Sequence, residues 1–296
     1  MTIDKFMYML GEESLYFPNI HSFNDKYEGS LSEKSKEEVR KTNLFDESTP
    51  IKQDKPFCVM KEHMETYSRN DKDSTMFNLH SFKTLIEDFS NHIMFCNCWF
   101  LKETESHSMW AEYGDKSPTS IAIVTTVGDL IESLEDLEYQ IHIGNVKYKN
   151  YQTDDIEGYE NFPSKNLTKP DTVLELFYAP IMHKRDIYDD EHEVRAIISF
   201  ESICENHADR VYTSKIPFYS DKLFEKDFLF FDPDRKTNLM KDIPPEGIPV
   251  RTNINQLIQK VVISPYAKKF FKEQLKKLLE KHNMNPDIVE KSKINY

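Results

Sequence analysis

Three charged residues stand at the entrance to an apolar run, and this pattern limits what the chain can fold into. Residues 194–200 read as a buried strand, and Glu191, Glu193 and Arg195 lead into it. Because side chains alternate along a strand, the three charges are expected on one face. Unpaired charges inside a domain are costly, so they must reach solvent at a strand end, pair with each other in a ladder on an edge strand, or line a pocket.

The composition indicates a folded protein with a sizeable core. Apolar residues make up 39% of the 296 residues, with 20 Phe and 15 Tyr, which excludes a disordered chain of low hydrophobicity. No glycine-rich phosphate loop occurs among the 7 Gly. No apolar stretch is long enough to span a membrane, and the first residues do not read as a secretory segment. We therefore expect a soluble, cytoplasmic protein of bacterial type.

The charge and the cysteines exclude two further classes. The 38 basic and 51 acidic residues give a net charge of −13, which disfavours a protein that coats duplex DNA. Cys96 and Cys98 share a strand face, but no second Cys pair follows. A thiolate metal site is therefore not expected, and buried free thiols are the simpler interpretation.

The order of predicted elements indicates an α+β fold, with residues 1–296 as a single domain. A mixed central sheet with flanking helices is expected, since no strict βαβ order is present. The predicted strands cover residues 15–17, 94–101, 121–125, 146–151, 194–200 and 228–231. Predicted helices cover an N-terminal segment and residues 32–40, 82–93, 106–113 and 127–137, the last capped by Thr126. Loops are predicted over residues 46–56 and 153–171.

The C-terminal segment predicts an amphipathic helix. Ser264 stands at the N-cap position and Pro265 at the first helical position, and the helix is expected to continue to Lys281. Its lysines are expected to face water. Its apolar face is expected to be buried and consists of Phe270, Phe271, Leu275, Leu278 and Leu279.

Four segments carry side chains that are able to do chemistry. Residues 23–29 form either a capped turn or a turn that points Asp25 and Glu28 into a pocket. Residues 105–113 place Ser106 near His107 without a visible third partner, so helix packing is the simpler interpretation. Residues 121–126 end in hydroxyls that bind a ligand or cap a helix. The fourth segment, residues 183–198, carries the Lys184-Arg185 pair and the Glu-x-Glu-x-Arg pattern.

Several motifs follow one another in a fixed order along the whole chain. The first is Leu-Tyr-Phe at 15–17, followed by a Phe-Asn-Asp…Glu turn at 23–29, and the second is Cys-Trp at 98–99, followed by Glu-Ser-x-x-Met-Trp-x-x-Tyr at 105–113. Ala-Ile-x-[ST]-Thr follows at 122–126, Val-x-Tyr at 146–148 and Lys-Arg…Glu-x-Glu-x-Arg-Ala at 184–196. The tail matches at 262–265 and 289–292. This order resembles a bacterial family described as domain of unknown function 2971. Lys26 stands where its members usually have Pro, and the family implies a fold and a site rather than a reaction.

The polar residues also resemble, in their order, mono-ADP-ribosyltransferases of the Arg–Ser–Glu kind. Thr125-Thr126 corresponds to the hydroxyl strand of those enzymes, and Glu191-His192-Glu193 corresponds to their Glu-x-Glu pair. The resemblance implies that Glu193 holds the nicotinamide ribose of NAD and that Glu191 orients the acceptor. The leading Arg of those enzymes has no counterpart here. Such an activity would suit an effector of a bacterial defence or toxin system.

Two other classes of function stay open. In a metal-dependent nuclease or hydrolase, Lys184 would lie beside the scissile phosphate, and Mg²⁺ would be held by the carboxylates of Asp25, Glu28, Glu191 and Glu193. In a non-catalytic sensor, the pair Trp110 and Tyr113 and the pair Lys184-Arg185 would bind an anionic or aromatic ligand, either a small molecule or a protein. No membrane partner, no resident metal and no strong nucleic-acid signal are expected, and the oligomeric state is not indicated. The candidate catalytic residues are Glu191 and Glu193, and most of the candidate ligand-binding residues are expected to border one cleft with them. The candidate ligand-binding residues are Asn24, Asp25, Trp110, Tyr113, Thr125, Lys184, Arg185 and Arg195.

Overall fold

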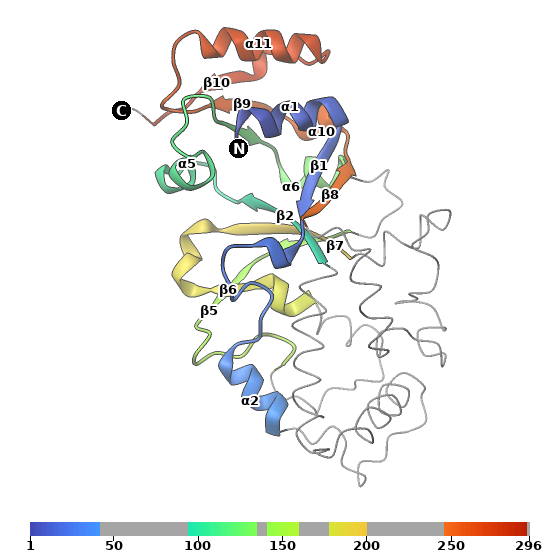
Figure 1. Ribbon diagram of the computed structural model, residues 1–296, viewed down its shortest axis with the longest axis vertical. Coiled ribbons are helices and arrows are strands. Elements are labelled where there is room, and N and C mark those ends of the chain that lie inside the picture. The colour runs from blue at the N-terminus through green and yellow to red at the C-terminus, as the bar shows by residue number, and fades with distance from the viewer. Residues whose placement is uncertain (42–93, 135–140, 160–177, 200–245, 295–296) are drawn as a thin grey trace, which may run out of the picture. The chain divides into compact units, whose positions relative to one another are not determined.

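The computed structural model describes residues 1–41, 94–134, 141–159, 178–199 and 246–294 (Figure 1). Helices and mixed sheets of a few strands alternate through these residues, which confirms the predicted α+β class. The chain divides into two compact units. Unit 1 comprises residues 1–17, 100–138 and 249–296, and unit 2 comprises residues 18–99 and 139–248. The single-domain expectation stays a prediction, and the predicted elements at 46–56, 82–93 and 228–231 lie outside the described residues.

Unit 1 contains a three-stranded mixed sheet. Its central strand β9 (Lys260–Ile263) pairs in parallel with β10 (Val289–Lys291) and antiparallel with β3 (Ile121–Val124). The register places Ile121 opposite Ile263 and Val289 opposite Val261, and all four side chains are buried. The strand predicted over residues 121–125 therefore forms the edge of a small packed sheet.

Short helices surround this sheet in unit 1. They are α1 (Ile3–Glu12), α5 (His107–Tyr113), α6 (Val127–Glu132) and α10 (Ile254–Leu257). The predicted cap of α6 is confirmed, because Thr126 Oγ1 accepts the Asp129 N–H at 3.0 Å. The helix ends at Glu132, whereas the sequence predicts an end at residue 137. Directly after Glu132, Ser133 Oγ donates to the Leu130 carbonyl at 2.8 Å and the chain turns.

The C-terminal helix α11 (Phe271–Lys281) begins later than predicted. Ser264 continues the sheet instead of capping a helix, because its N–H donates to the Ser120 carbonyl at 3.0 Å. Its hydroxyl accepts the Tyr266 N–H and closes a turn. Phe270 therefore precedes the helix and is 59% exposed, so its predicted burial is wrong.

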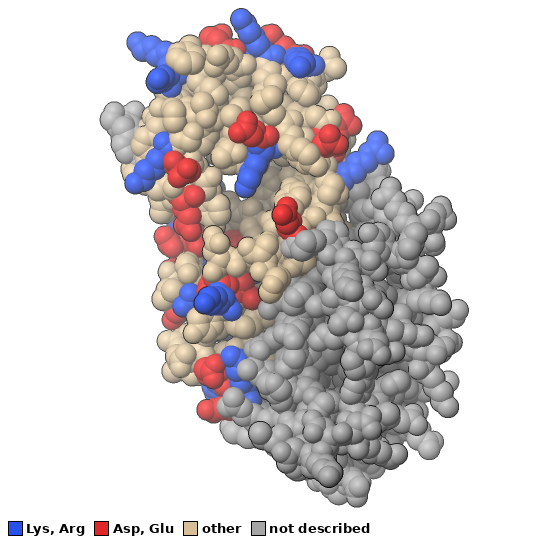
Figure 2. All heavy atoms as spheres, viewed as in Figure 1, with Lys and Arg blue, Asp and Glu red and all other residues tan. Residues whose placement is uncertain are grey.

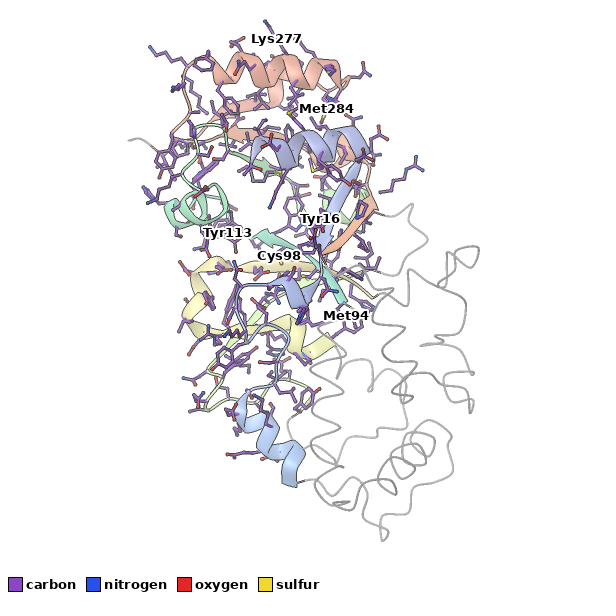
Figure 3. All side chains as sticks on the ribbon, in the orientation of Figure 1. Tyr16, Met94, Cys98, Tyr113, Lys277 and Met284 are labelled. Atoms are coloured by element: carbon purple, nitrogen blue, oxygen red, sulfur yellow. The ribbon has the colours of Figure 1, made fainter. Side chains whose placement is uncertain are left out.

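The apolar face of α11 follows an i, i+4, i+8 pattern. Phe271, Leu275 and Leu279 are buried, whereas Leu278 is only partly covered. Lys277 is exposed on the outer side of the helix and Met284 is buried on the side that faces the strands (Figure 3). Lysines and acidic residues alternate over this outer surface (Figure 2). The prediction of a helix with a buried stripe and a solvated basic face is thus confirmed over a shorter range.

The first strand of the chain pairs with a strand that lies far from it in the sequence. β1 (Ser14–Pro18) and β8 (Gly247–Arg251) form a two-stranded sheet. The Leu15 N–H donates to Thr252 Oγ1 at 3.3 Å, which ties the first strand to the residue after β8. The strand predicted at residues 15–17 is confirmed.

Unit 2 is formed around strand β7 (Glu193–Ser199), which lies between β2 (Met94–Phe100) and β4 (Ile141–Asn145). β4 and β7 are antiparallel, with Ile143 opposite Ala196. Because β7 is flanked on both sides, its charged residues do not form a ladder on an edge strand. That alternative is wrong, and the charges must be satisfied inside the unit.

A second, two-stranded sheet completes the site region of unit 2. β5 (Lys147–Lys149) and β6 (His183–Arg185) run parallel, and Tyr148 is the register partner of Lys184. The helices described in unit 2 are η1 (Ile20–Ser22), α2 (Glu33–Lys41), η2 (Ala179–Met182) and η3 (Asp186–Glu191), and η5 (Pro286–Ile288) precedes β10 in unit 1. Across the described parts of both units, none of the helices has the length and apolar character needed to cross a membrane.

Candidate functional site

Five charged residues of unit 2 meet at the start of strand β7, and we call them the charged cluster. None is more than 8% exposed. β7 supplies two members, β6 one, η3 one and the turn after η1 one. Glu191 lies at the end of η3, before β7 begins at Glu193, so its predicted place on the strand face is wrong. The members are Glu28, Lys184, Glu191, Glu193 and Arg195.

Arg195 forms the base of the charged cluster and is completely buried. Its Nε donates to Glu193 Oε1 at 2.8 Å, and its NH2 donates to Glu193 Oε2 at 3.0 Å and to Glu28 Oε2 at 2.9 Å. NH1 donates to the carbonyl of Ile181. The guanidinium thus binds two carboxylates and one carbonyl, which is how proteins usually compensate a buried cation.

Lys184 lies among three carboxylates. Its Nζ is 2.6 Å from Glu191 Oε2, 3.3 Å from Glu28 Oε1 and 3.4 Å from Glu193 Oε2. An ammonium has three N–H donors, so each carboxylate can take one. Glu28 and Glu193 are therefore shared between Lys184 and Arg195, whereas Glu191 contacts the lysine.

The charged cluster carries one more negative charge than positive. It holds three carboxylates and two cations, which gives a net charge of −1 when all are ionised. Burial by itself raises the pKa of Glu193, but Arg195 and Lys184 outweigh it and hold that pKa below its ordinary value. Burial likewise lowers the pKa of Lys184, but Glu193, Glu28 and Glu191 raise it above its ordinary value. Glu193 and Lys184 are therefore charged at neutral pH.

Exposure divides the charged cluster into a base and a rim. The side chains of Arg195 and Glu28 are 0% and 3% exposed, whereas those of Glu193, Glu191 and Lys184 are 7–9% exposed. We call Glu193, Glu191 and Lys184 the rim of the charged cluster, and Arg195 and Glu28 its base. Arg195 of the base binds Glu193 of the rim, and Glu28 of the base lies 3.3 Å from Nζ of Lys184.

A second ion pair adjoins the charged cluster. Arg185 Nε and NH2 donate to the two carboxylate oxygens of Asp25 at 3.2 and 2.9 Å. The guanidinium carbon lies 4.5 Å from the ring centre of Tyr27 and 5.3 Å from that of Tyr188. The Tyr188 ring also lies 4.8 Å from Nζ of Lys184, so it contacts the cations of both groups.

Tyr148 connects the two sheets of unit 2 at the charged cluster. Its hydroxyl oxygen accepts the backbone N–H of Glu193 at 2.8 Å, while its own strand pairs with that of Lys184. On strand β2, the Cys98 sulfur lies 3.6 Å from the Cys96 sulfur; Cys96 is buried but Cys98 is exposed, so the expected burial of both thiols is wrong for Cys98. Cys98 is labelled on β2 in Figure 3. The shared strand face predicted for the two cysteines is confirmed.

The structure brings six of the predicted site residues together in unit 2. Glu191, Glu193, Arg195 and Lys184 belong to the charged cluster, and Asp25 and Arg185 form the adjoining pair. Asp25 also caps its turn, since its Oδ1 accepts the Tyr27 N–H at 3.1 Å, which confirms the capped turn; that the turn points into a pocket stays a prediction. Asn24 is exposed and makes no hydrogen bond with the residues that the structure describes.

The other three predicted residues belong to unit 1. Trp110 is buried, and its Nε1 donates to Glu105 Oε2 at 2.8 Å. Tyr113 on α5 is 50% exposed (Figure 3), and Thr125 Oγ1 donates to the Thr126 carbonyl at 3.3 Å. Within unit 1, Trp110 thus has a structural role, and the expected cleft shared with the charged cluster stays a prediction.

The motif around Trp110 is explained by contacts with the C-terminal segment. Glu105 Oε2 accepts the Ser292 hydroxyl at 2.6 Å, and Glu105 Oε1 accepts the Lys293 N–H at 2.7 Å. Glu105 therefore joins α5 to the residues after β10. The Ser106 hydroxyl contacts the Ser108 hydroxyl at 2.8 Å at the start of α5, and that Ser106 and His107 act in helix packing stays a prediction.

Sequence reasoning missed three tyrosines and undervalued Glu28. Tyr27 and Tyr188 carry no spacing that links them to Lys184 or Arg185, so no local pattern indicates them. Tyr148 had one signal, the Val-x-Tyr strand of the family motif. Among the described residues, no three His, Cys, Asp or Glu side chains are arranged to hold a metal ion.

Comparison with known proteins identifies no homologue of this chain. No family model matches the chain, and no curated protein or solved structure is significantly similar to it. The resemblance to the bacterial family described as domain of unknown function 2971 therefore stays a prediction.

Proposed function

We propose that unit 2 carries a glycosyl-transfer site that uses NAD and transfers its ADP-ribosyl group. The observation that supports this best is the charge of the buried cluster. Its net charge is −1, and Glu193, one of the two carboxylates at its rim, is held ionised by Arg195 and Lys184. Such a site favours a ligand that develops positive charge.

The chemistry of NAD fits a site of this charge. The bond between the ribose C1′ and the nicotinamide nitrogen breaks, its electron pair leaves with nicotinamide, and a new bond forms between C1′ and an acceptor oxygen or nitrogen. Positive charge then develops on the ribose, as in other glycosyl transfers. Because the pyridinium becomes neutral nicotinamide on leaving, the reaction needs no protonated carboxyl group, and Glu193 with its lowered pKa is no general acid.

The arrangement suggests a role for each member of the charged cluster. Glu193 is proposed to accept a ribose hydroxyl and to stabilise the positive ribose. Glu191, the other carboxylate at the rim, is proposed to orient the acceptor and to take its proton. Arg195 and Glu28 are positioning residues, because they are the most deeply buried members and contact the rim residues.

The metal-dependent alternative has less support. A divalent cation would need the space between the three carboxylates, and Nζ of Lys184 lies there at 2.6–3.4 Å from them. A binding module without catalysis would use the same residues, and the experiment below separates it from an enzyme. A cytoplasmic location and a role in bacterial defence or toxicity remain proposals that depend on the resemblances.

The test compares two variants that remove a carboxylate from the same two cations. Glu193→Gln changes a rim carboxylate, and Glu28→Gln changes one at the base; both contact Arg195 and Lys184. Nicotinamide release from NAD is followed by chromatography, and the melting temperature of each variant is recorded. We expect Glu193→Gln to reduce turnover at least about a hundredfold, and Glu28→Gln to reduce it far less at a similar loss of stability.

Three outcomes would contradict the proposal in different ways. Wild-type protein that binds NAD without releasing nicotinamide would indicate a binding module. Wild-type protein with no response to NAD but with a thermal shift in Mg²⁺ plus a nucleotide would favour the metal-dependent class. A Glu193→Gln variant that melts early yet keeps full turnover would show that Glu193 is scaffold.

A further inference from the structure

The hydroxyl group of Tyr148 has an unused donor at the charged cluster. Its oxygen accepts the Glu193 N–H at 2.8 Å, which leaves the phenolic proton to donate elsewhere. Among the residues that the structure describes, Tyr148 makes no other hydrogen bond. Burial raises the pKa of Tyr148, and Glu193 and Glu191 raise it further, so the phenol keeps its proton.

Tyr148 is held in place from two directions. Strand β5 fixes its backbone beside Lys184 in the parallel register, and the Glu193 N–H fixes its hydroxyl oxygen at the first residue of β7. The side chain is only half-buried. The donor is therefore preorganised at the first residue of β7, Glu193, whose carboxylate belongs to the charged cluster.

A donor beside an acceptor is complementary to one chemical group in particular. A hydroxyl both donates and accepts, so it can donate to a carboxylate and accept from the phenol at the same time. An ammonium, a guanidinium or a pyridinium has no lone pair to accept that proton, and its approach would leave the phenol without a partner. The two groups together therefore favour a hydroxylated ligand over a simple organic cation.

We propose that Tyr148 is a substrate-positioning residue that makes the site selective for a glycosyl group with free hydroxyls, its phenol donating to a hydroxyl that Glu193 or Glu191 accepts. The proposal rests on the function proposed above, which it deepens: net negative charge attracts the ligand, and the tyrosine selects the sugar. It assigns the substrate class as ribosides rather than organic cations.

The experiment compares two ligands of equal charge. Nicotinamide riboside and 1-methylnicotinamide, which is methylated at the ring nitrogen, both carry the pyridinium, but only the first carries ribose hydroxyls. Their dissociation constants are measured by calorimetry for wild type, Tyr148→Phe and Tyr151→Phe. Tyr151 is the matched control, because its hydroxyl also bonds one backbone group, donating to the His183 carbonyl at 3.1 Å in the same unit.

We expect wild type to prefer the riboside by about tenfold or more, the factor that one well-made hydrogen bond supplies. Tyr148→Phe should lower the ratio several-fold by weakening the riboside alone, because Glu193 still accepts a hydroxyl, and Tyr151→Phe should leave the ratio unchanged. A ratio that Tyr148→Phe does not alter overturns the assignment, as does wild-type protein that binds both ligands equally or binds neither. Riboside selectivity that depends on Tyr148, without nicotinamide release from NAD, would leave this assignment intact and overturn the proposed reaction.

Discussion

Arg195 binds both carboxylate oxygens of Glu193, at 2.8 and 3.0 Å, from a position two residues later on the same strand. Side chains at i and i+2 share a face of a strand, so this pair is local. What makes it unusual is its setting, because β7 is the central strand of its sheet and Arg195 has no exposed surface. The pair is stable only because Glu28 and Lys184 arrive from other segments.

The first prediction concerns Arg195. Arg195→Met should destabilise the protein by about 3–5 kcal/mol, because Glu193 and Glu28 would lose their shared cation inside the unit. Urea unfolding followed by circular dichroism measures the change. Arg185→Met is the matched control, since its pair with Asp25 is partly exposed and should contribute about 1 kcal/mol or less. Equal losses in the two variants would mean that the charged cluster is open to water.

The second prediction concerns acid. The folded-state pKa of Glu193 lies below its unfolded value of about 4.3, so its contribution is present above that value and is lost as the pH falls toward the folded-state pKa. The difference in unfolding free energy between wild type and Glu193→Gln should be constant between about pH 5 and 9 and shrink below about pH 4. Urea titrations at a series of pH values measure it.

Glu112→Gln serves as the control for this acid titration, because Glu112 is exposed on α5. Lys184 is expected to lose its stabilising contribution at high pH instead of low pH. Its folded-state pKa is raised, so its contribution is present below the unfolded value of about 10.4 and is lost only as the pH rises through the folded-state value. A Glu193→Gln difference that stays constant down to pH 2 would contradict the lowered pKa.

The third prediction concerns the join between α5 and the C-terminal segment. Glu105→Ala should cost about 1–3 kcal/mol, because Trp110 Nε1, the Ser292 hydroxyl and the Lys293 N–H all lose their acceptor. Hydrogen exchange should show faster exchange of the Lys293 amide. Glu112→Ala, on the same helix and exposed, should change neither quantity. Unaltered protection of Lys293 in Glu105→Ala would disprove the join.

The fourth prediction concerns helix α11. Leu275→Ala should cost about 2–5 kcal/mol, because Leu275 is buried in the i, i+4, i+8 stripe. Phe270→Ala should cost much less, since Phe270 is 59% exposed. Thermal unfolding of the two variants separates them. A double change of Lys272 and Lys276 to Gln should cost well under 1 kcal/mol, and a large loss there would identify the lysine face as an interface.

Local patterns in the sequence determined most elements of the described residues and part of the charged cluster. Strands β1, β2, β3 and β7 and the Thr126 cap follow from alternation and from a hydroxyl before a helix, which depend on neighbours in the chain. The same reasoning placed Glu193 and Arg195 on one face, because a strand with charges leading into an apolar run allows few solutions.

The tertiary structure alone decided which partners neutralise these charges. Glu28 lies 167 residues before Arg195, and no spacing in the chain links them. The hydrogen bond from the Glu193 N–H to Tyr148 depends on how β5 pairs with β6, and the late start of α11 depends on Ser264 pairing with Ser120 in the sheet. Long-range backbone pairing and burial determine these contacts. They outweigh local preference, because leaving a buried polar group without a partner costs more free energy than a helix cap or a favourable helix propensity contributes.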